Sequence, residues 1–122
     1  MEAERYYTTT LFPKIAEELD VVCVRFKDTG GRSFNPVPFD NIFIYPQKSH
    51  KAVFTETKME KGKLKDHQLK FAIFCAEKRL KHYVIRIYPS FYLLCKMDIT
   101  GKEDIKDNFR EVKDMILTME KL

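Results

Sequence analysis

The sequence lacks the features that mark several large classes of protein. No apolar run approaches the roughly 20 residues that cross a membrane, and no apolar segment follows the charged residues 1–5. We therefore expect neither a membrane anchor nor a secretory signal. The chain has no internal repeat, low-complexity tract or linker-like segment. Its 122 residues indicate one domain, 1–122, large enough for a single hydrophobic core.

Cysteine is also scarce. Cys23, Cys75 and Cys95 are an odd number, lie far apart, and each occurs in an apolar strand or helix pattern. No C-x-x-C or Cys/His spacing suggests a zinc site. We interpret all three as small buried side chains in a reducing, intracellular compartment, most simply the cytoplasm.

Neither sign of charge dominates. Lys and Arg exceed Asp and Glu by 22 to 18, so the net charge is +4. This balance favours a polyanionic partner only mildly. The hydrophobic fraction of 44% and the charged fraction of 33% are those of an ordinary soluble globular protein.

Two strand patterns, at 39–45 and 52–58, flank a polar break that has the composition of a hairpin connection. If the turn is centred in that break, antiparallel pairing puts Asp40 opposite Glu56. Side chains two apart on a strand share a face, so Lys58 projects beside Glu56. The sequence therefore predicts two carboxylates and one amine at one end of this hairpin.

This cluster contains the side chains that phosphodiester hydrolysis requires. Carboxylate oxygens of Asp40 and Glu56 can hold Mg²⁺ or Mn²⁺ while leaving waters on the cation, and the Lys58 ammonium can orient a water or offset charge. Asp40, fifteen intervening residues and then Glu-Thr-Lys resembles the PD-(D/E)XK nuclease superfamily. One departure is Phe39, which separates Pro38 from the aspartate where that family has Pro-Asp directly.

The segment after Lys58 extends the resemblance. A short basic loop containing Gly62 leads to Leu64 and then to Gln68 at the start of a predicted helix, an order similar to the virus-type replication-repair nuclease branch. The pair His67-Gln68 is also similar to the Holliday-junction resolvase and penicillin-binding-protein-related factor A group. The resemblance covers residues 38–95, and the choice between the branches stays open.

The resemblance implies a restriction-endonuclease-like fold and a Mg²⁺- or Mn²⁺-dependent DNA endonuclease, a hydrolase. Asp40, Glu56 and the backbone carbonyl of Thr57 would hold the cation. Lys58 would position or deprotonate the attacking water or stabilise the transition state, and Gln68 would support it.

The superfamily also has a glutamate near the start of its first helix, for which Glu4 and Glu17 are the candidates. The start of that helix should lie at the same end of the sheet as Asp40, which favours Glu4. Glu17 is more simply part of the solvated side of the helix.

The resemblance also suggests the substrate and the biological setting. Branched DNA such as a Holliday junction, cut by a homodimer in DNA repair or recombination, is the first expectation. A nick-, flap- or single-strand-specific enzyme of viral or mobile-element origin is the second. Two other readings stay open: a nuclease-inactive relative that only binds nucleic acid, and a small protein-interaction module that uses the C-terminal amphipathic helix.

Basic side chains lie close in sequence to the proposed metal site, on the first strand, in the Gly-rich segment after it and in the loop after Lys58. Side chains of this kind position a nucleic acid through its phosphates. The residues expected to contact DNA are Arg25, Lys27, Arg32, Lys61, Lys63, Lys65 and His67.

Hydrophobic periodicity predicts the other elements. Residues 2–19 are expected to be mainly helical, either as a kinked helix or as one that restarts with Thr10 as N-cap and Pro13 in its first turn. Strands are expected at 21–27, 83–88 and 91–97, the last two paired as an antiparallel hairpin. A helix capped by Asp66 is expected at 67–81.

The C-terminal region predicts a final helix. Thr100 and Glu103 have the spacing of a capping box. Apolar residues then recur at steps of four and three, a pattern typical of an amphipathic helix that covers the sheet or joins a partner: Ile105, Phe109, Val112, Ile116 and Met119. The predicted order is helix, three strands, helix, two strands, helix, which is a small α/β domain with a mixed sheet flanked by helices.

Overall fold

The computed structural model describes residues 2–26, 37–49 and 51–122. Its helical segments are α1 (Glu2–Tyr6), the π-helical η1 (Tyr7–Leu11), α2 (Phe12–Glu18), the 3₁₀ turn η2 (Pro46–Lys48), α3 (Asp66–Lys78) and α4 (Val112–Met119). Its strands are β1 (Val22–Arg25), β2 (Asn41–Tyr45), β3 (Lys51–Met59), β4 (His82–Tyr88), β5 (Phe91–Met97) and β6 (Glu103–Phe109).

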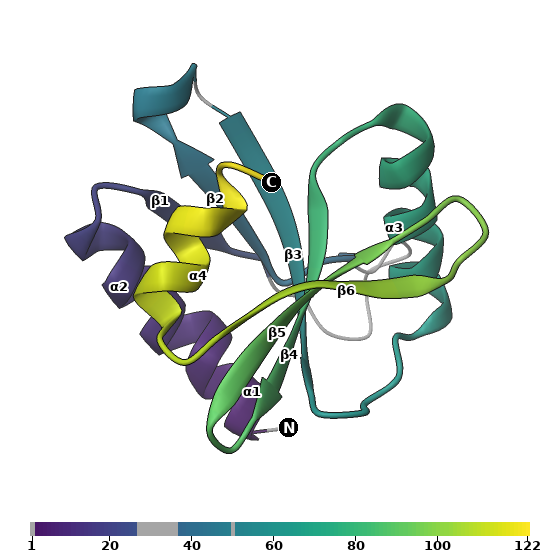
Figure 1. Ribbon diagram of the computed structural model, residues 1–122, viewed down its shortest axis with the longest axis horizontal. Helices are drawn as coiled ribbons and strands as arrows, with labels where there is room; N and C mark the ends of the chain where they lie inside the picture. The colour runs from purple at the N-terminus through teal and green to yellow at the C-terminus, as the bar shows by residue number, and fades with distance from the viewer. Residues whose placement is uncertain (1, 27–36, 50) are drawn as a thin grey trace.

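One six-stranded sheet organises the described residues, with the strands in the order in which they occur along the chain. Neighbouring strands are antiparallel except β3 and β4, which are parallel and joined through α3. Helices α1, α2 and α4 lie on one side of the sheet and α3 on the other (Figure 1). The predicted α/β domain with a mixed sheet is confirmed.

The β2–β3 hairpin has the predicted register. Asn41 pairs with Thr55, and the Asp40 N–H donates to the Thr55 carbonyl at 2.8 Å. Asp40 therefore lies opposite Glu56 at the end of the hairpin away from its turn. At the turn itself, Ser49 has a φ of 59°, which lets the chain reverse after the 3₁₀ turn.

The first helix does not restart at Thr10. A π-helical segment, Tyr7–Leu11, joins α1 to α2, and Pro13 falls in the first turn of α2. Proline has no N–H to donate back into the preceding turn, and a π segment accommodates that loss without ending the helix. The Thr9 hydroxyl donates instead to the Arg5 carbonyl at 2.6 Å.

The C-terminal helix is shorter than its sequence pattern predicts, because β6 occupies the first half of the expected helix. The Thr100 hydroxyl and N–H both donate to the Asp98 carboxylate, at 2.6 and 2.8 Å, so Thr100 belongs to a hairpin turn and not to a helix cap. Gly101 has a φ of 87°, which suits that turn. Ile105, expected on the apolar stripe, is 64% exposed.

Helix α3 begins one residue earlier than expected, so Asp66 is its first helical residue and not its cap. Lys65 is the N-cap, and the Gln68 side-chain oxygen accepts from the Lys65 N–H at 2.8 Å. The helix ends at Lys78, where Arg79 adopts the left-handed conformation at a φ of 60°.

The main core lies between the sheet and the helices α2 and α4. Its buried side chains include Phe12, Phe43, Ile85, Leu94 and the whole stripe of α4: Val112, Met115, Ile116 and Met119. Cys75 and Cys95 are buried as expected, whereas Cys23 is only partly buried. Among the described residues, no helix is long and apolar enough to cross a membrane.

A second apolar cluster fills the space between the sheet and α3. The Phe39 ring lies 5.3 Å from Phe26, 5.0 Å from Phe54 and 5.3 Å from Phe71. Phe39 is the residue that separates Pro38 from Asp40 in the sequence. Its ring thus anchors the chain just before Asp40 against both β3 and α3.

His82 lies beside this cluster, 5.8 Å from the Phe71 ring, and is buried with no hydrogen-bond partner for either ring nitrogen among the described residues. Burial, with a smaller effect from Lys96, lowers the pKa of His82 to about 4 from its ordinary 6.5. The lowered pKa keeps the imidazole of His82 neutral, so the fold can bury it against the Phe71 ring without burying a charge.

Replacing His82 with leucine is expected to remove a pH dependence from the stability. As the pH falls from about 6.5 to about 4, the unfolded state binds a proton that the folded state does not. The wild type should lose up to about 3 kcal/mol over this window, at about 1.4 kcal/mol per pH unit. Urea unfolding of both proteins from pH 4 to 7 measures the difference, and parallel curves would contradict it.

Candidate functional site

The open end of the β2–β3 hairpin brings together three of the residues that the sequence singles out. Asp40 precedes β2, and Glu56 and Lys58 lie on β3. The Lys58 ammonium is 3.6 Å from the Glu56 carboxylate. The second oxygen of Asp40, Oδ2, accepts from the Thr57 N–H at 2.8 Å. The pairing that turn symmetry predicts thus becomes a cluster of two acids and one amine.

Glu56 is held in an unusual state. Its side chain is buried, and its Oε1 atom has no hydrogen-bond partner among the described residues. Burial, then the charge of Asp40 and a hydrogen bond with it, raise the pKa of Glu56 to about 9, although Lys58 opposes the shift. Two carboxylates that adjoin in a poorly solvated place disfavour each other's charged form, so a further cation would help both to be charged.

The donor set fits a hard divalent cation. Mg²⁺ uses one or two carboxylates and keeps several waters, which the Asp40 and Glu56 oxygens can satisfy. The unpartnered Glu56 Oε1 leaves one oxygen free for such a role. The Thr57 N–H and carbonyl point to the same side of β3, the side of Asp40, because backbone groups alternate along a strand. The predicted Thr57 carbonyl is therefore directed to the same place.

The first-helix acid is less closely connected. Glu4 lies in α1, which contacts β3. About one helical turn after Glu4, the carbonyl of Thr8 accepts a hydrogen bond from the side-chain amide of Asn41 at 3.0 Å. No hydrogen bond or ion pair among the described residues joins Glu4 to Asp40 or Glu56, and these residues contain no group of three acidic, His or Cys side chains placed to hold a metal. Glu17 lies in α2 beside a different pocket, with Asp20.

Arg25, at the end of β1, borders the acids from the other side. Its guanidinium is 3.9 Å from the Asp40 carboxylate, and its Nε donates to the Thr8 hydroxyl at 3.2 Å. A small cavity of about 80 Å³ lies here, lined by Arg25, Phe26, Val37, Phe39, Asp40, Lys65, His67 and Gln68. This cavity extends from Asp40 to the start of α3, and Arg25, Lys65 and His67 are the basic side chains in its lining.

Among the described residues, no hydrogen bond joins Gln68 to Lys58. The side-chain oxygen of Gln68 is used by the Lys65 N–H, and its side chain lines the small cavity on the Asp40 side. His67 lines the same cavity. Lys61 and Lys63 are exposed in the loop between β3 and α3, while Lys27 and Arg32 lie outside the described residues.

Arg86 is a residue of this region that the sequence analysis did not single out. It pairs with Lys58 across β3 and β4, and its Nη1 donates to the carbonyls of Glu60 and Gly62 at 2.8 and 2.6 Å. Its Nε donates a hydrogen bond to Oε2 of Glu103 at 2.5 Å, and its Nη2 donates one to Oε1 at 2.8 Å. Arg86 thus fixes the turn that follows Lys58. The sequence feature that could have identified Arg86 is its position as a single arginine within the largely apolar strand β4.

Replacing Arg86 with methionine is expected to destabilise the fold by about 1–3 kcal/mol, because the partly buried Glu103 loses its charged hydrogen-bond partner. The double variant Arg86→Met/Glu103→Leu should recover part of that loss, since neither charge is then left alone, although the hydrogen bonds to the Glu60 and Gly62 carbonyls stay lost. Chemical denaturation of the three proteins gives the free energies of unfolding. A single variant as stable as the wild type would contradict this role.

Comparisons of the chain with protein-family models, with curated proteins and with solved structures found no match.

Proposed function

We propose that this protein is a metal-dependent DNA endonuclease that hydrolyses phosphodiester bonds. The observation that carries the proposal is the adjoining pair Asp40 and Glu56, with the Lys58 ammonium 3.6 Å from Glu56, at the open end of a hairpin. The same three residues carry the resemblance to the PD-(D/E)XK superfamily. The order of one helical unit, three antiparallel strands, a helix and a parallel strand also supports it.

Each residue of the cluster has a separate task in this proposal. Asp40, Glu56 and the Thr57 carbonyl hold Mg²⁺ or Mn²⁺, which supplies a water of lowered pKa and neutralises phosphate oxygens. As an ammonium, Lys58 orients the attacking water or offsets charge on the phosphate; only as a neutral amine would it accept the proton of that water. Arg25, whose guanidinium is 3.9 Å from the Asp40 carboxylate, pairs with a phosphate oxygen in this proposal.

A DNA substrate is supported by the basic groups around the acids. The exposed Lys61, Lys63 and Lys65 follow directly from the strand that carries Glu56, and His67 lines the cavity beside Asp40. Such groups bind the phosphate backbone whatever its sequence. The choice between branched DNA and nicked, flapped or single-stranded DNA, and a homodimer acting in repair or recombination, stay predictions from the resemblance.

The interaction-module alternative loses its main support, because the apolar stripe of α4 is buried against the sheet and the first helix. A nuclease-inactive relative that binds nucleic acid is the reading that an experiment must separate from the endonuclease.

The separating experiment is cleavage of labelled four-way junction, flap, single-stranded and duplex DNA with Mg²⁺, Mn²⁺ or EDTA. We expect DNA cleavage that requires the metal and is lost in Glu56→Ala. The preferred DNA substrate would then indicate which branch of the nuclease superfamily the protein resembles most. Glu77→Ala, which removes an exposed acid of α3, is the matched control and should cut normally. DNA binding without cutting in any of these conditions would favour the inactive relative.

A further inference from the structure

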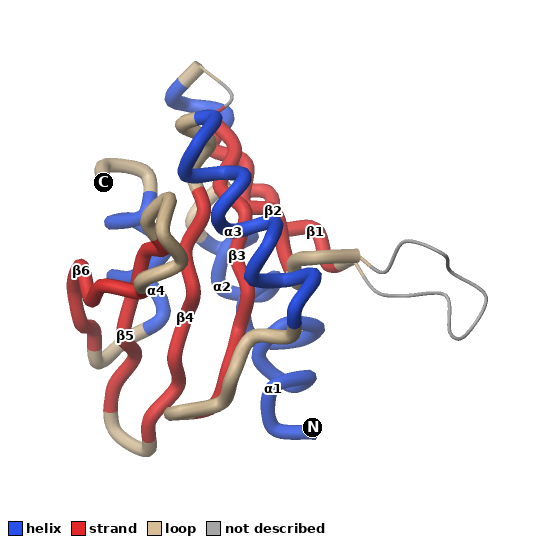
Figure 2. Tube along the Cα trace, turned by 90° about the vertical axis from the view of Figure 1, so that its right-hand side faces the viewer, coloured by secondary structure: helices blue, strands red, loops and turns tan. Residues whose placement is uncertain are grey.

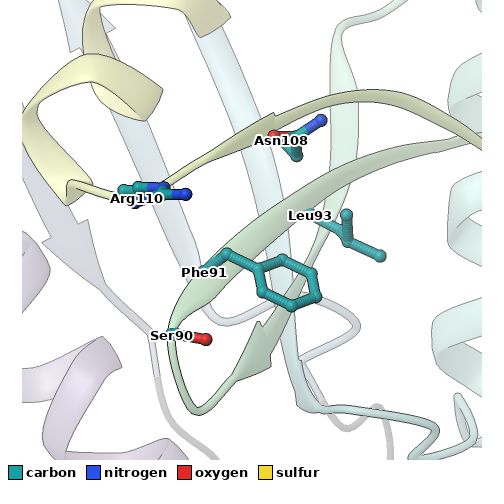
Figure 3. Close-up of a pocket in the computed structure, with 5 residues that line it drawn as sticks. All are labelled: Ser90, Phe91, Leu93, Asn108 and Arg110. Carbon is teal, nitrogen blue, oxygen red and sulfur yellow. The ribbon is translucent and has the colours of Figure 1, made fainter.

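A groove of about 510 Å³ opens on the sheet at β5 and β6, and the proposed cleavage site does not use it. Figure 3 shows its lining: Phe91 and Leu93 project from β5, Ser90 lies at the turn before them, and Asn108 and Arg110 lie on β6 and just after it. Its volume is in the range of pockets that bind small organic groups. An aromatic ring, an amide, a guanidinium and a hydroxyl meet there.

The groove lies on the same face of the sheet as Lys58. The strand registers pair Lys58 with Arg86, Arg86 with Leu93, and Leu93 with Asn108. Residues paired in this way project to one face. The row crosses three strand spacings, roughly 14 Å. Helix α3 covers part of this face (Figure 2), where it contacts β4 and β5 and its Phe71 packs on Phe54. At this spacing, one strand of nucleic acid is long enough to reach from one place to the other.

The chemistry of the lining favours a nucleotide over a purely apolar ligand. Phe91 stacks on Tyr88 with ring centroids 4.7 Å apart and planes within 4°, which gives a fixed aromatic platform. The Asn108 side-chain amide can both donate to and accept from a base edge. In the described part of the chain Arg110 takes part in no ion pair, whereas Arg86 is paired with Glu103. Arg110 is thus the cation available to a phosphate.

We propose that this groove binds an unpaired nucleotide of the DNA strand that passes over the Asp40–Glu56 site. The base stacks on Phe91, Asn108 contacts its edge and Arg110 pairs with its phosphate. Stacking on an aromatic ring needs a base that is out of the duplex and tolerates any sequence. The inference rests on the proposed function and narrows its substrate to DNA with a single-stranded segment, such as a flap or an open junction arm.

The test is DNA binding measured by fluorescence anisotropy in EDTA, so that it does not depend on cleavage. Phe91→Leu keeps an apolar side chain but removes the ring, Phe91→Tyr keeps the ring, and Phe74→Leu alters an exposed ring on α3 as a control. We expect Phe91→Leu to bind single-stranded and flap DNA roughly tenfold to a hundredfold more weakly. Binding of blunt duplex should be unchanged, and Phe91→Tyr and Phe74→Leu should match the wild type.

A second readout reports stacking directly. A single-stranded oligonucleotide with 2-aminopurine should lose fluorescence on binding to the wild type and lose less on binding to Phe91→Leu. Equal affinities of the wild type and Phe91→Leu for flap DNA would overturn the proposal, as would equal quenching or a wild type that prefers blunt duplex. A protein that binds flap DNA through Phe91 but never cuts it would contradict the proposed endonuclease activity and would still support nucleotide binding in the groove.

Discussion

Replacing Lys58 with methionine is expected to lower the rate of metal-dependent DNA cleavage by about 10²- to 10³-fold, which corresponds to about 2.7–4 kcal/mol of transition-state stabilisation. The ammonium lies 3.6 Å from Glu56, where a cation-bound water and a phosphate would meet. Methionine keeps the length and the apolar stem of lysine but can neither donate a hydrogen bond nor carry charge. Single-turnover cleavage of a labelled substrate with saturating Mg²⁺ gives the rate.

The control for this variant is Lys70→Met, which removes an exposed lysine of α3 whose one ion pair within the described part of the chain is with the exposed Asp66. It changes the net charge equally and should cut at close to the wild-type rate. Thermal unfolding establishes that both variants are folded. If folded Lys58→Met cut DNA as fast as Lys70→Met, Lys58 would have no part in the chemistry.

Replacing Glu56 with glutamine is expected to stabilise the metal-free protein increasingly as the pH rises. An unfolded Glu56 ionises near 4.5, whereas burial and Asp40 hold the proton on the folded side chain up to about pH 9. The folded state therefore binds more protons between these values, and the wild type loses stability across that window. The loss has an upper limit of about 1.4 kcal/mol per pH unit, which amounts to a few kcal/mol near pH 8.

The measurement is denaturant unfolding in EDTA from pH 4.5 to 9, read as the slope of the stability against pH. Glu56→Gln should lack the downward slope that the wild type shows. Glu77→Gln, at an exposed position of α3, removes one carboxylate without changing the buried pair and should keep the wild-type slope. Identical slopes for the wild type and Glu56→Gln would show that Glu56 is not held protonated.

This expected gain in stability is itself informative about function. A buried acid with an unpartnered oxygen beside a second acid weakens the fold in the absence of a cation. Groups that lower stability in this way concentrate at active sites, where their chemistry is required. Asp40 and Glu56 therefore differ from the ordinary surface acids of the chain, such as Glu77.

The arrangement of the acid pair could be predicted from the sequence because it depends on local symmetry. Two strand patterns on either side of one short break define the centre of a turn near Lys48, and the centre fixes the register. The observed pairing of Asn41 with Thr55 agrees with that prediction. The burial of Glu56 could not be predicted in this way, because it depends on the pairing of β3 with β4.

The strand β6 could not be predicted because its local pattern favours a helix. Its sequence contains Asp, Asn and Lys and has no strand-like alternation, and the spacing from Ile105 to Met119 suits a helical stripe. Long-range contacts decide the outcome: Glu103 binds Arg86, and Asp98 holds the hairpin turn through Thr100 and Lys102. A sequence pattern does not contain these contacts, and here they override helix propensity.

The central claim is that Asp40 and Glu56 hold a divalent cation, and isothermal titration of Mg²⁺ into the metal-free protein tests it most directly. We expect saturable binding to the wild type and at least tenfold weaker binding to Asp40→Asn, with Glu77→Gln binding like the wild type. Mn²⁺ titrated in the same way should give the same order of affinities among the three proteins. A wild type that binds neither cation, or an Asp40→Asn variant that binds both as tightly as the wild type, would contradict the metal site.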